Sequence, residues 1–136
     1  MILNKTITLF NYAGEKEKEA VYKKTVLSHV YFFVQKGANE STQGKKSNDN
    51  ARLYIFHHRS KAYSENGCLK DFMIHSEWEN SIVQDLYWTL SCSSKDYFVL
   101  GECPDKIPPV DAFKIISVNE KVAGTRRMHH WEIDGK

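Results

Sequence analysis

Six histidines and three cysteines are the residues of this chain whose chemistry could support a metal site or a nucleophile. Four of the histidines form two adjacent pairs, His57-His58 and His129-His130. Neighbouring residues of a strand point to opposite faces, so such a pair is poorly placed to chelate one ion. The chain contains no H-x-x-x-H or H-E-x-x-H spacing. We therefore predict no metal site and interpret the histidines as ordinary strand or surface residues.

The cysteines are odd in number and contain no Cys-x-x-Cys pair. They are Cys68, Cys92 and Cys103. No motif of a cysteine nucleophile surrounds any of them. A secreted disulfide framework is therefore not expected. We expect instead buried or incidental thiols in a reducing cytosol.

Phosphate cradles and acid–base pairs are also missing from the sequence. Gly101, Gly124 and Gly135 are isolated, and we interpret them as turn residues because no glycine-rich loop precedes a helix. The sequence pI is near 8.4 with interspersed charges, whereas nucleic-acid binders usually have a pI above about 9. Arg126 and Arg127 are accordingly interpreted as a solvated tip. We predict no catalytic residue, no cofactor and no enzymatic activity.

The composition predicts one soluble domain with a modest core. The chain has 136 residues, a formal net charge of +2 and 41% hydrophobic residues, and single domains commonly span about 100–150 residues. The longest apolar run, residues 30–34, is far shorter than the roughly 20 residues of a membrane span. The N-terminus lacks the basic region and apolar core of a signal peptide. We expect a single domain over residues 1–136, made in the cytoplasm without targeting.

Short runs rich in aromatic and β-branched residues recur along the chain, and such runs are typical of strands. Residues 95–133 contain three of them separated by polar turns, which predicts a three-stranded antiparallel meander. Earlier strands are expected at residues 6–12 and 20–27, joined by a hairpin loop or tip at residues 13–19. The apolar alternation shifts at Ser28-His29, which indicates a bulge or a bend.

Two central strands are expected at residues 29–35 and 52–57, and both are apolar on both faces. A strand of this kind is covered on both sides: inside a barrel, under a helix or against a neighbouring subunit. The aromatic residues of these strands are candidates for a subunit interface, or for a platform on which single-stranded nucleic acid stacks. They are Tyr31, Phe33, Tyr54 and Phe56.

A polar segment, residues 36–50, separates these two strands and carries one apolar side chain, Ala38. Such a segment cannot bury enough surface to offset the entropy lost on ordering, and loops of this length are usually functional or disordered. It is either a plain hairpin tip or a loop that orders in an assembly or on a partner. Its candidate interface residues are Lys36, Gly37, Asn39, Glu40, Lys45, Lys46 and Asn50.

One short helix is predicted at residues 77–86. Ser76 and Glu79 match a capping box at its N-terminus, and apolar residues recur at i, i+4 and i+8 from Trp78. Together with the strands, this helix predicts a mainly β fold: a small antiparallel β-barrel or sandwich with one short helix and a long polar loop.

Strand motifs spread over nearly the whole chain carry a family resemblance. They are TITLFN at 6–11, TVLSHVYFF at 25–33, ARLYI at 51–55, WTL at 88–90, KDYFVLGE at 95–102 and HWEIDGK at 130–136. These motifs resemble those of a family of short proteins from the structural gene clusters of Gram-positive phages and prophages. More broadly, the chain is similar to the head–tail joining (stopper or head-completion) proteins of the phage neck.

The resemblance implies a virion structural protein, a minor capsid or head–tail connector component that forms a ring by assembly. The implied partners are further copies of the chain, portal or adaptor proteins and tail proteins, without a membrane. Residues 36–50 would correspond to a loop that projects into the channel, through which DNA passes without sequence-specific binding. The alternative is an accessory β-barrel module that binds single-stranded nucleic acid or a protein partner.

Overall fold

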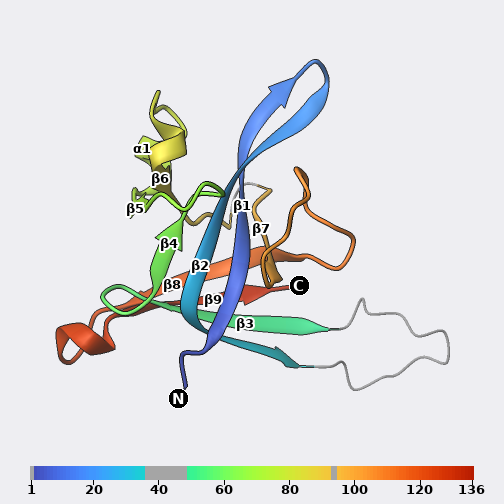
Figure 1. Ribbon diagram of the computed structural model, residues 1–136. Coiled ribbons are helices and arrows are strands. Elements are labelled where there is room, and N and C mark those ends of the chain that lie inside the picture. Colours follow the sequence, from blue (N-terminus) through green and yellow to red (C-terminus); the bar gives the residue numbers. More distant parts are fainter. Residues whose placement is uncertain (1, 36–48, 93–94) are drawn as a thin grey trace, which may run out of the picture.

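A computed structural model describes residues 2–35, 49–92 and 95–136, and the fold over these residues is mainly β (Figure 1). Seven antiparallel strands follow the order β1-β7-β8-β9-β3-β2-β4, and β1 also pairs with β2, so the sheet nearly closes into a ring. The strands of this sheet are β1 Lys5–Lys16, β2 Glu19–Gln35, β3 Asn50–Phe56, β4 Lys61–Tyr63, β7 Tyr97–Leu100, β8 Phe113–Lys121 and β9 His130–Gly135. The expected barrel-like, mainly β architecture is confirmed.

The smaller elements lie beside this sheet. Two short strands, β5 and β6, pair in parallel. The bounds are β5 Asp71–Phe72, α1 His75–Trp78, η2 Gln84–Leu86, β6 Tyr87–Trp88 and η3 Arg126–Met128. Figure 1 shows α1, β5 and β6 grouped together, away from the connection that contains η3.

The core lies inside the curved sheet, where alternate residues of each strand point inward. Ile7, Leu27, Leu53 and Ile133 are fully buried there, and burying such a side chain contributes about 1.5–3 kcal/mol. A Cβ on Gly135 would lie 2.7 Å from two ring atoms of Phe98. Gly135 is therefore a core position of β9 where the ring of Phe98 leaves no room for a side chain, and its interpretation as a turn residue was wrong.

The C-terminal meander is confirmed. Strand β7 pairs antiparallel with β8 from Tyr97 opposite Lys114, and β8 pairs antiparallel with β9 as far as Lys121 opposite His130. The two central strands, β2 and β3, also pair antiparallel, with Phe32 opposite Leu53.

The hairpin of β1 and β2 is longer than predicted. Strand pairing continues out to Lys16 and Glu19, so the loop is only the two-residue turn Glu17-Lys18. Both turn residues have positive φ, 54° and 66°, which is the geometry of a type I′ turn whose twist matches the flanking strands. The outer part of this hairpin projects beyond the body of the molecule (Figure 1).

The shift in alternation at Ser28-His29 is a β-bulge. His29 has φ of 57°, and the register with β1 slips between Lys5, opposite Val30, and Thr6, opposite Ser28. The extra residue allows one continuous strand to pair with β1 along its first half and with β3 along its second.

The predicted helix at residues 77–86 is wrong in extent. Helix α1 has four residues, its N-cap is Ile74, and no side chain caps it. Trp78 is fully buried and its Nε1 donates to Tyr87 O at 3.1 Å, but Ile82 is fully exposed. The segment therefore turns back around Trp78 after one helical turn, and the apolar spacing from Trp78 to Leu86 does not form a buried face.

Candidate functional site

The outer face of β2 and β3 carries the four aromatic residues that the sequence singles out. Tyr31 lies directly opposite Tyr54 in the register, with ring centroids 5.3 Å apart. Their strand neighbours Val30 and Leu53 are fully buried in the core, so alternation turns the tyrosines outward. Phe33, further along the same face, is 51% exposed. The inner face is covered as expected, and the outer face is only partly covered.

A histidine that sequence reasoning missed extends this face onto β9. The ring of His130 lies 5.2 Å from that of Tyr54 and stacks on that of Phe56 at 4.8 Å. Tyr31, Tyr54, His130 and Phe56 therefore form one continuous run of rings, here called the outer aromatic row. The alternation of β9, in which Trp131 and Ile133 are buried, is the signal that could have placed His130 outside.

Charged side chains lie at both ends of this face. The guanidinium of Arg59 lies 5.5 Å from the ring centroid of Phe56, a cation–π contact. At the other end Arg52 Nε donates to Asp134 Oδ1 at 2.9 Å, and this bond raises the pKa of Arg52. Both partners are exposed, so the pair fixes side-chain geometry more than it adds stability.

A shallow hollow lies beside Phe33 at the Arg52 end of this face. Its volume is about 340 Å³, and Phe33, Arg52, Ile116 and Asp134 contribute to its lining. Its described lining combines the Arg52–Asp134 ion pair with polar and apolar groups.

Most of the candidate channel-loop residues lie outside the described residues. These are Lys36, Gly37, Asn39, Glu40, Lys45 and Lys46. Asn50 is described: it is exposed at the start of β3, opposite Gln35 at the end of β2.

The two histidine pairs, far apart in the sequence, come together. A backbone hydrogen bond of 3.0 Å from His57 N to His129 O joins them, and the ring centroids of His58 and His129 lie 6.4 Å apart. His57 stacks on Trp131 at 3.7 Å, and its Nε2 lies 2.6 Å from Glu120 Oε2. Sequence reasoning missed this cluster because only the pairing of β3 with β9 brings the pairs together. No group of three metal-ligating side chains is arranged to hold an ion within the described residues.

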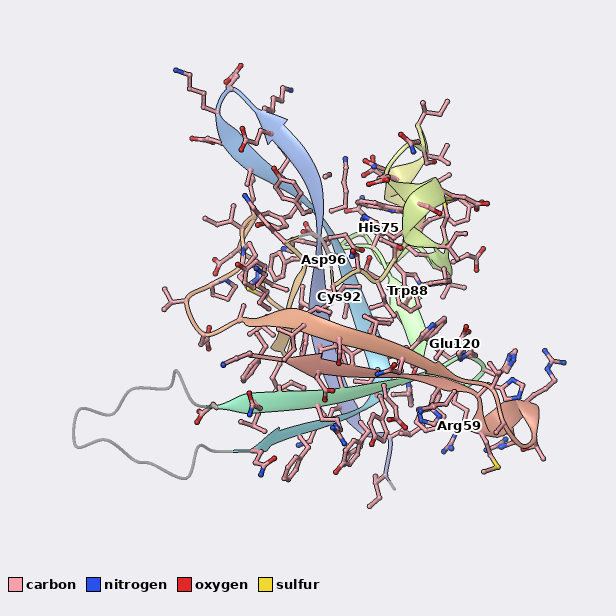
Figure 2. All side chains as sticks on the ribbon, turned by 180° about the vertical axis from the view of Figure 1, so that it is seen from behind. Arg59, His75, Trp88, Cys92, Asp96 and Glu120 are labelled. Atoms are coloured by element: carbon pink, nitrogen blue, oxygen red, sulfur yellow. The ribbon has the colours of Figure 1, made fainter. Side chains whose placement is uncertain are left out.

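The charge around His58 is positive. Desolvation, followed by the charges of Arg126, His57 and His129, lowers the pKa of His58. Figure 2 shows Arg59 and Glu120 at this same end of the molecule, close to η3.

The cysteines are not buried. Cys68 and Cys92 are exposed, and Cys103 is half-buried with its Sγ 3.6 Å from Asp105 Oδ2. Of the two alternatives expected, buried or incidental thiols, burial does not apply, because all three residues lie outside the strands, in connections that run over the surface.

Lys70 is a buried amine that the sequence did not reveal. Its Nζ donates to Lys24 O at 3.0 Å and to Thr25 Oγ1 at 2.9 Å. Burial lowers the pKa of Lys70 to about 8, and the nearby charge of Asp85 opposes this shift. The two bonds fasten the connection after β4 to β2, which is a structural role.

A second buried polar group fastens the connection between β6 and β7 to β1. Asn11 Nδ2 donates to Thr89 O at 2.8 Å and to Asp96 Oδ2 at 3.0 Å, while Tyr12 N donates to Asp96 Oδ1 at 2.8 Å. Asn11 and Asp96 are both buried, and buried polar groups whose hydrogen bonds are satisfied in this way rigidify the fold.

The geometry thus defines a small, nearly closed β-ring protein with a partly covered aromatic face and a histidine-rich end. A model of a family of unknown function, DUF6751, matches residues 2–136, and the chain belongs to this family. Neither the curated proteins nor the solved structures include a match to the chain. Over the residues described, no helix is long and apolar enough to cross a membrane.

Proposed function

We propose that this protein is a phage virion structural subunit, a head–tail joining or neck component that acts by forming a ring. According to this proposal, the protein binds further copies of itself and portal, adaptor or tail proteins. It acts through this assembly and not through catalysis. The observation that carries the proposal is the aromatic outer face of β2 and β3, which the chain itself leaves partly uncovered.

The composition of this face supports a role in subunit contact. Aromatic residues and arginine are enriched at the centres of protein interfaces. Phe33 is 51% exposed, and Arg52 and Arg59 lie at the two ends of the face. A neighbouring subunit over Phe33 would remove this apolar surface from water, which favours association by about 25 cal/mol per Å².

The projecting hairpin supports the same proposal. Strand β7 pairs with β1 only from Ile7 to Phe10, and β4 pairs with β2 only from Val26 to Ser28. Over the described residues, the rest of the hairpin therefore has no third strand beside it. A two-stranded ribbon is marginally stable alone, and its open edges can pair with another chain. In a ring, the open edges of this hairpin are available for pairing with a neighbouring subunit.

The strand motifs provide the specific part of the proposal. Their resemblance to head–tail joining proteins points to a ring placed on the portal or adaptor of a virion. On this proposal residues 36–50, between the two aromatic strands, form the loop that faces the DNA channel.

The proposal is tested by the mass of the purified protein in solution, measured by light scattering over a concentration series. We expect the wild type to assemble, alone or when mixed with portal and adaptor proteins, and Phe33→Ser to assemble less. Leu100→Ser is the matched control, because Leu100 is also 51% exposed but lies on β7. A wild-type monomer that binds none of these virion components would overturn the proposal.

A further inference from the structure

One end of the molecule is strongly basic. It consists of residues 57–61 and 119–130, which the bond from His57 N to His129 O joins, and is here called the basic end. It contains five lysines and arginines and one carboxylate, Glu120, although the whole chain has a net charge of only +2. The five cations are Arg59, Lys61, Lys121, Arg126 and Arg127. Glu120 is already engaged by His57, so this end presents uncompensated positive charge.

A second surface has the opposite character. Residues 71–92, here called the acidic segment, contain four carboxylates and no lysine or arginine. The carboxylates are Asp71, Glu77, Glu79 and Asp85, and all four residues are exposed. Two large apolar side chains of the same segment, Ile82 and Leu86, are exposed as well. The segment therefore combines negative charge with apolar surface.

These two surfaces do not neutralise each other within one chain. Among the described residues, no ion pair joins the basic end to the acidic segment; Asp85 pairs with Lys23 and Glu79 with His75. Figures 1 and 2 both show α1 and η3 at separate ends of the molecule. The positive charge of the basic end is thus not compensated by the acidic segment of the same chain.

We infer that the basic end of one copy docks on the acidic segment of the next copy, in a head-to-tail contact that repeats around the ring. The inference rests on the proposed function and names the two faces of the subunit contact. Complementary charge steers encounter and fixes the register of an interface. A contact between two different faces generates a ring when the rotation between copies closes.

The aromatic face fits the same contact. Arg59 belongs to the basic end and lies over Phe56 of the outer aromatic row, so the two surfaces are continuous. A neighbour's Ile82 and Leu86, both exposed, would supply the apolar partner of this row while its carboxylates meet the arginines. The interface would then have an apolar centre and a charged rim, as stable interfaces do.

Charge reversal tests the contact from both sides. Arg126→Glu with Arg127→Glu, and separately Glu77→Lys with Glu79→Lys, should each weaken self-association about tenfold or more, because like charges would oppose each other. Sedimentation velocity over a concentration series measures this change. Lys95→Glu with Lys106→Glu is the matched control, since it makes the same charge change on exposed residues of the connections before and after β7 and should leave association unchanged.

Recovery of assembly when the two charge reversals are combined would distinguish a direct contact from an indirect effect. An equimolar mixture of the two reversed proteins should assemble, because each reversed surface meets an opposite charge on the other variant. A chain that carries all four reversals should assemble alone for the same reason. Failure of both to assemble, with each variant folded by circular dichroism, would overturn the inference.

The outcomes also separate this inference from the proposed function. Wild-type protein that stays monomeric with and without virion partners contradicts the proposed function. Assembly that neither reversal alters leaves that function standing and overturns the charged contact. If Arg126→Glu with Arg127→Glu assembles normally but loses binding to a 30-base-pair DNA duplex in an anisotropy assay, the basic end binds nucleic acid and the inference is wrong.

Discussion

Lys70 is the residue whose surroundings most change its chemistry. Burial lowers its pKa from the ordinary value of 10.5 to about 8. Between these values the unfolded chain binds more protons than the folded chain, so the free energy of unfolding must rise with pH. Below pH 8 the cost of burying the charge is fully present, and it amounts to about 3 kcal/mol at most.

We therefore predict that the wild type becomes more stable from pH 8 to pH 9.5, and that Lys70→Met removes most of this increase. Urea unfolding at several pH values measures both slopes. Lys16→Met is the control, because Lys16 is exposed and its removal should leave the wild-type slope. Parallel slopes for wild type and Lys70→Met would show that burial does not shift the pKa of Lys70.

Gly135 gives a second prediction at the residue scale. A Cβ there would lie 2.7 Å from Phe98 ring atoms and 2.8 Å from Phe113 Cβ, so neither side chain can stay where it is. Overpacking of this kind usually costs about 1–3 kcal/mol. Gly135→Ala should lower the free energy of unfolding by that amount in a denaturant titration. An unchanged midpoint would mean that the rings move without cost.

The turn of the β1–β2 hairpin is the element whose sequence least suits its geometry. Glu17 and Lys18 both have positive φ, a conformation that costs residues other than glycine roughly 1–2 kcal/mol each, and Asn-Gly is the preferred pair for this turn. Glu17→Asn with Lys18→Gly should therefore stabilise the projecting hairpin.

Amide hydrogen exchange is the suitable measurement, because a projecting ribbon can open without global unfolding. We expect slower exchange at residues 13–22, with exchange in β9 unchanged. Equal exchange in the hairpin of both proteins would contradict the type I′ geometry, and slower exchange throughout would indicate a global effect.

Elements with a clear period of two were predictable from the sequence. The meander of β7, β8 and β9 was found because polar turn residues precede each of its strands, and the bulge at His29 was found because it disrupts the alternation. Helix α1 was overestimated because Trp78, Ile82 and Leu86 have helical spacing, which cannot reveal that Trp78 alone is buried. Strand β4 was missed because three residues contain too little pattern.

At the scale of the whole molecule, the sequence identified the aromatic face but not the histidine-rich end. Tyr31, Phe33, Tyr54 and Phe56 were found because each alternates with core residues on its own strand. His130 and Glu120 join the site only through the pairing of β3, β8 and β9, which no local pattern contains. Lys70 was missed for the same reason, since its bonds cross to β2.

Assembly into a closed ring is the central claim, and native mass spectrometry tests it most directly. The protein would be measured alone and mixed with the portal protein, at concentrations where light scattering detects association. The account predicts one dominant species whose mass is a fixed multiple of the 15.8 kDa chain, alone or on the portal. A 15.8 kDa monomer under every condition, or a ladder of masses without a preferred multiple, would contradict it.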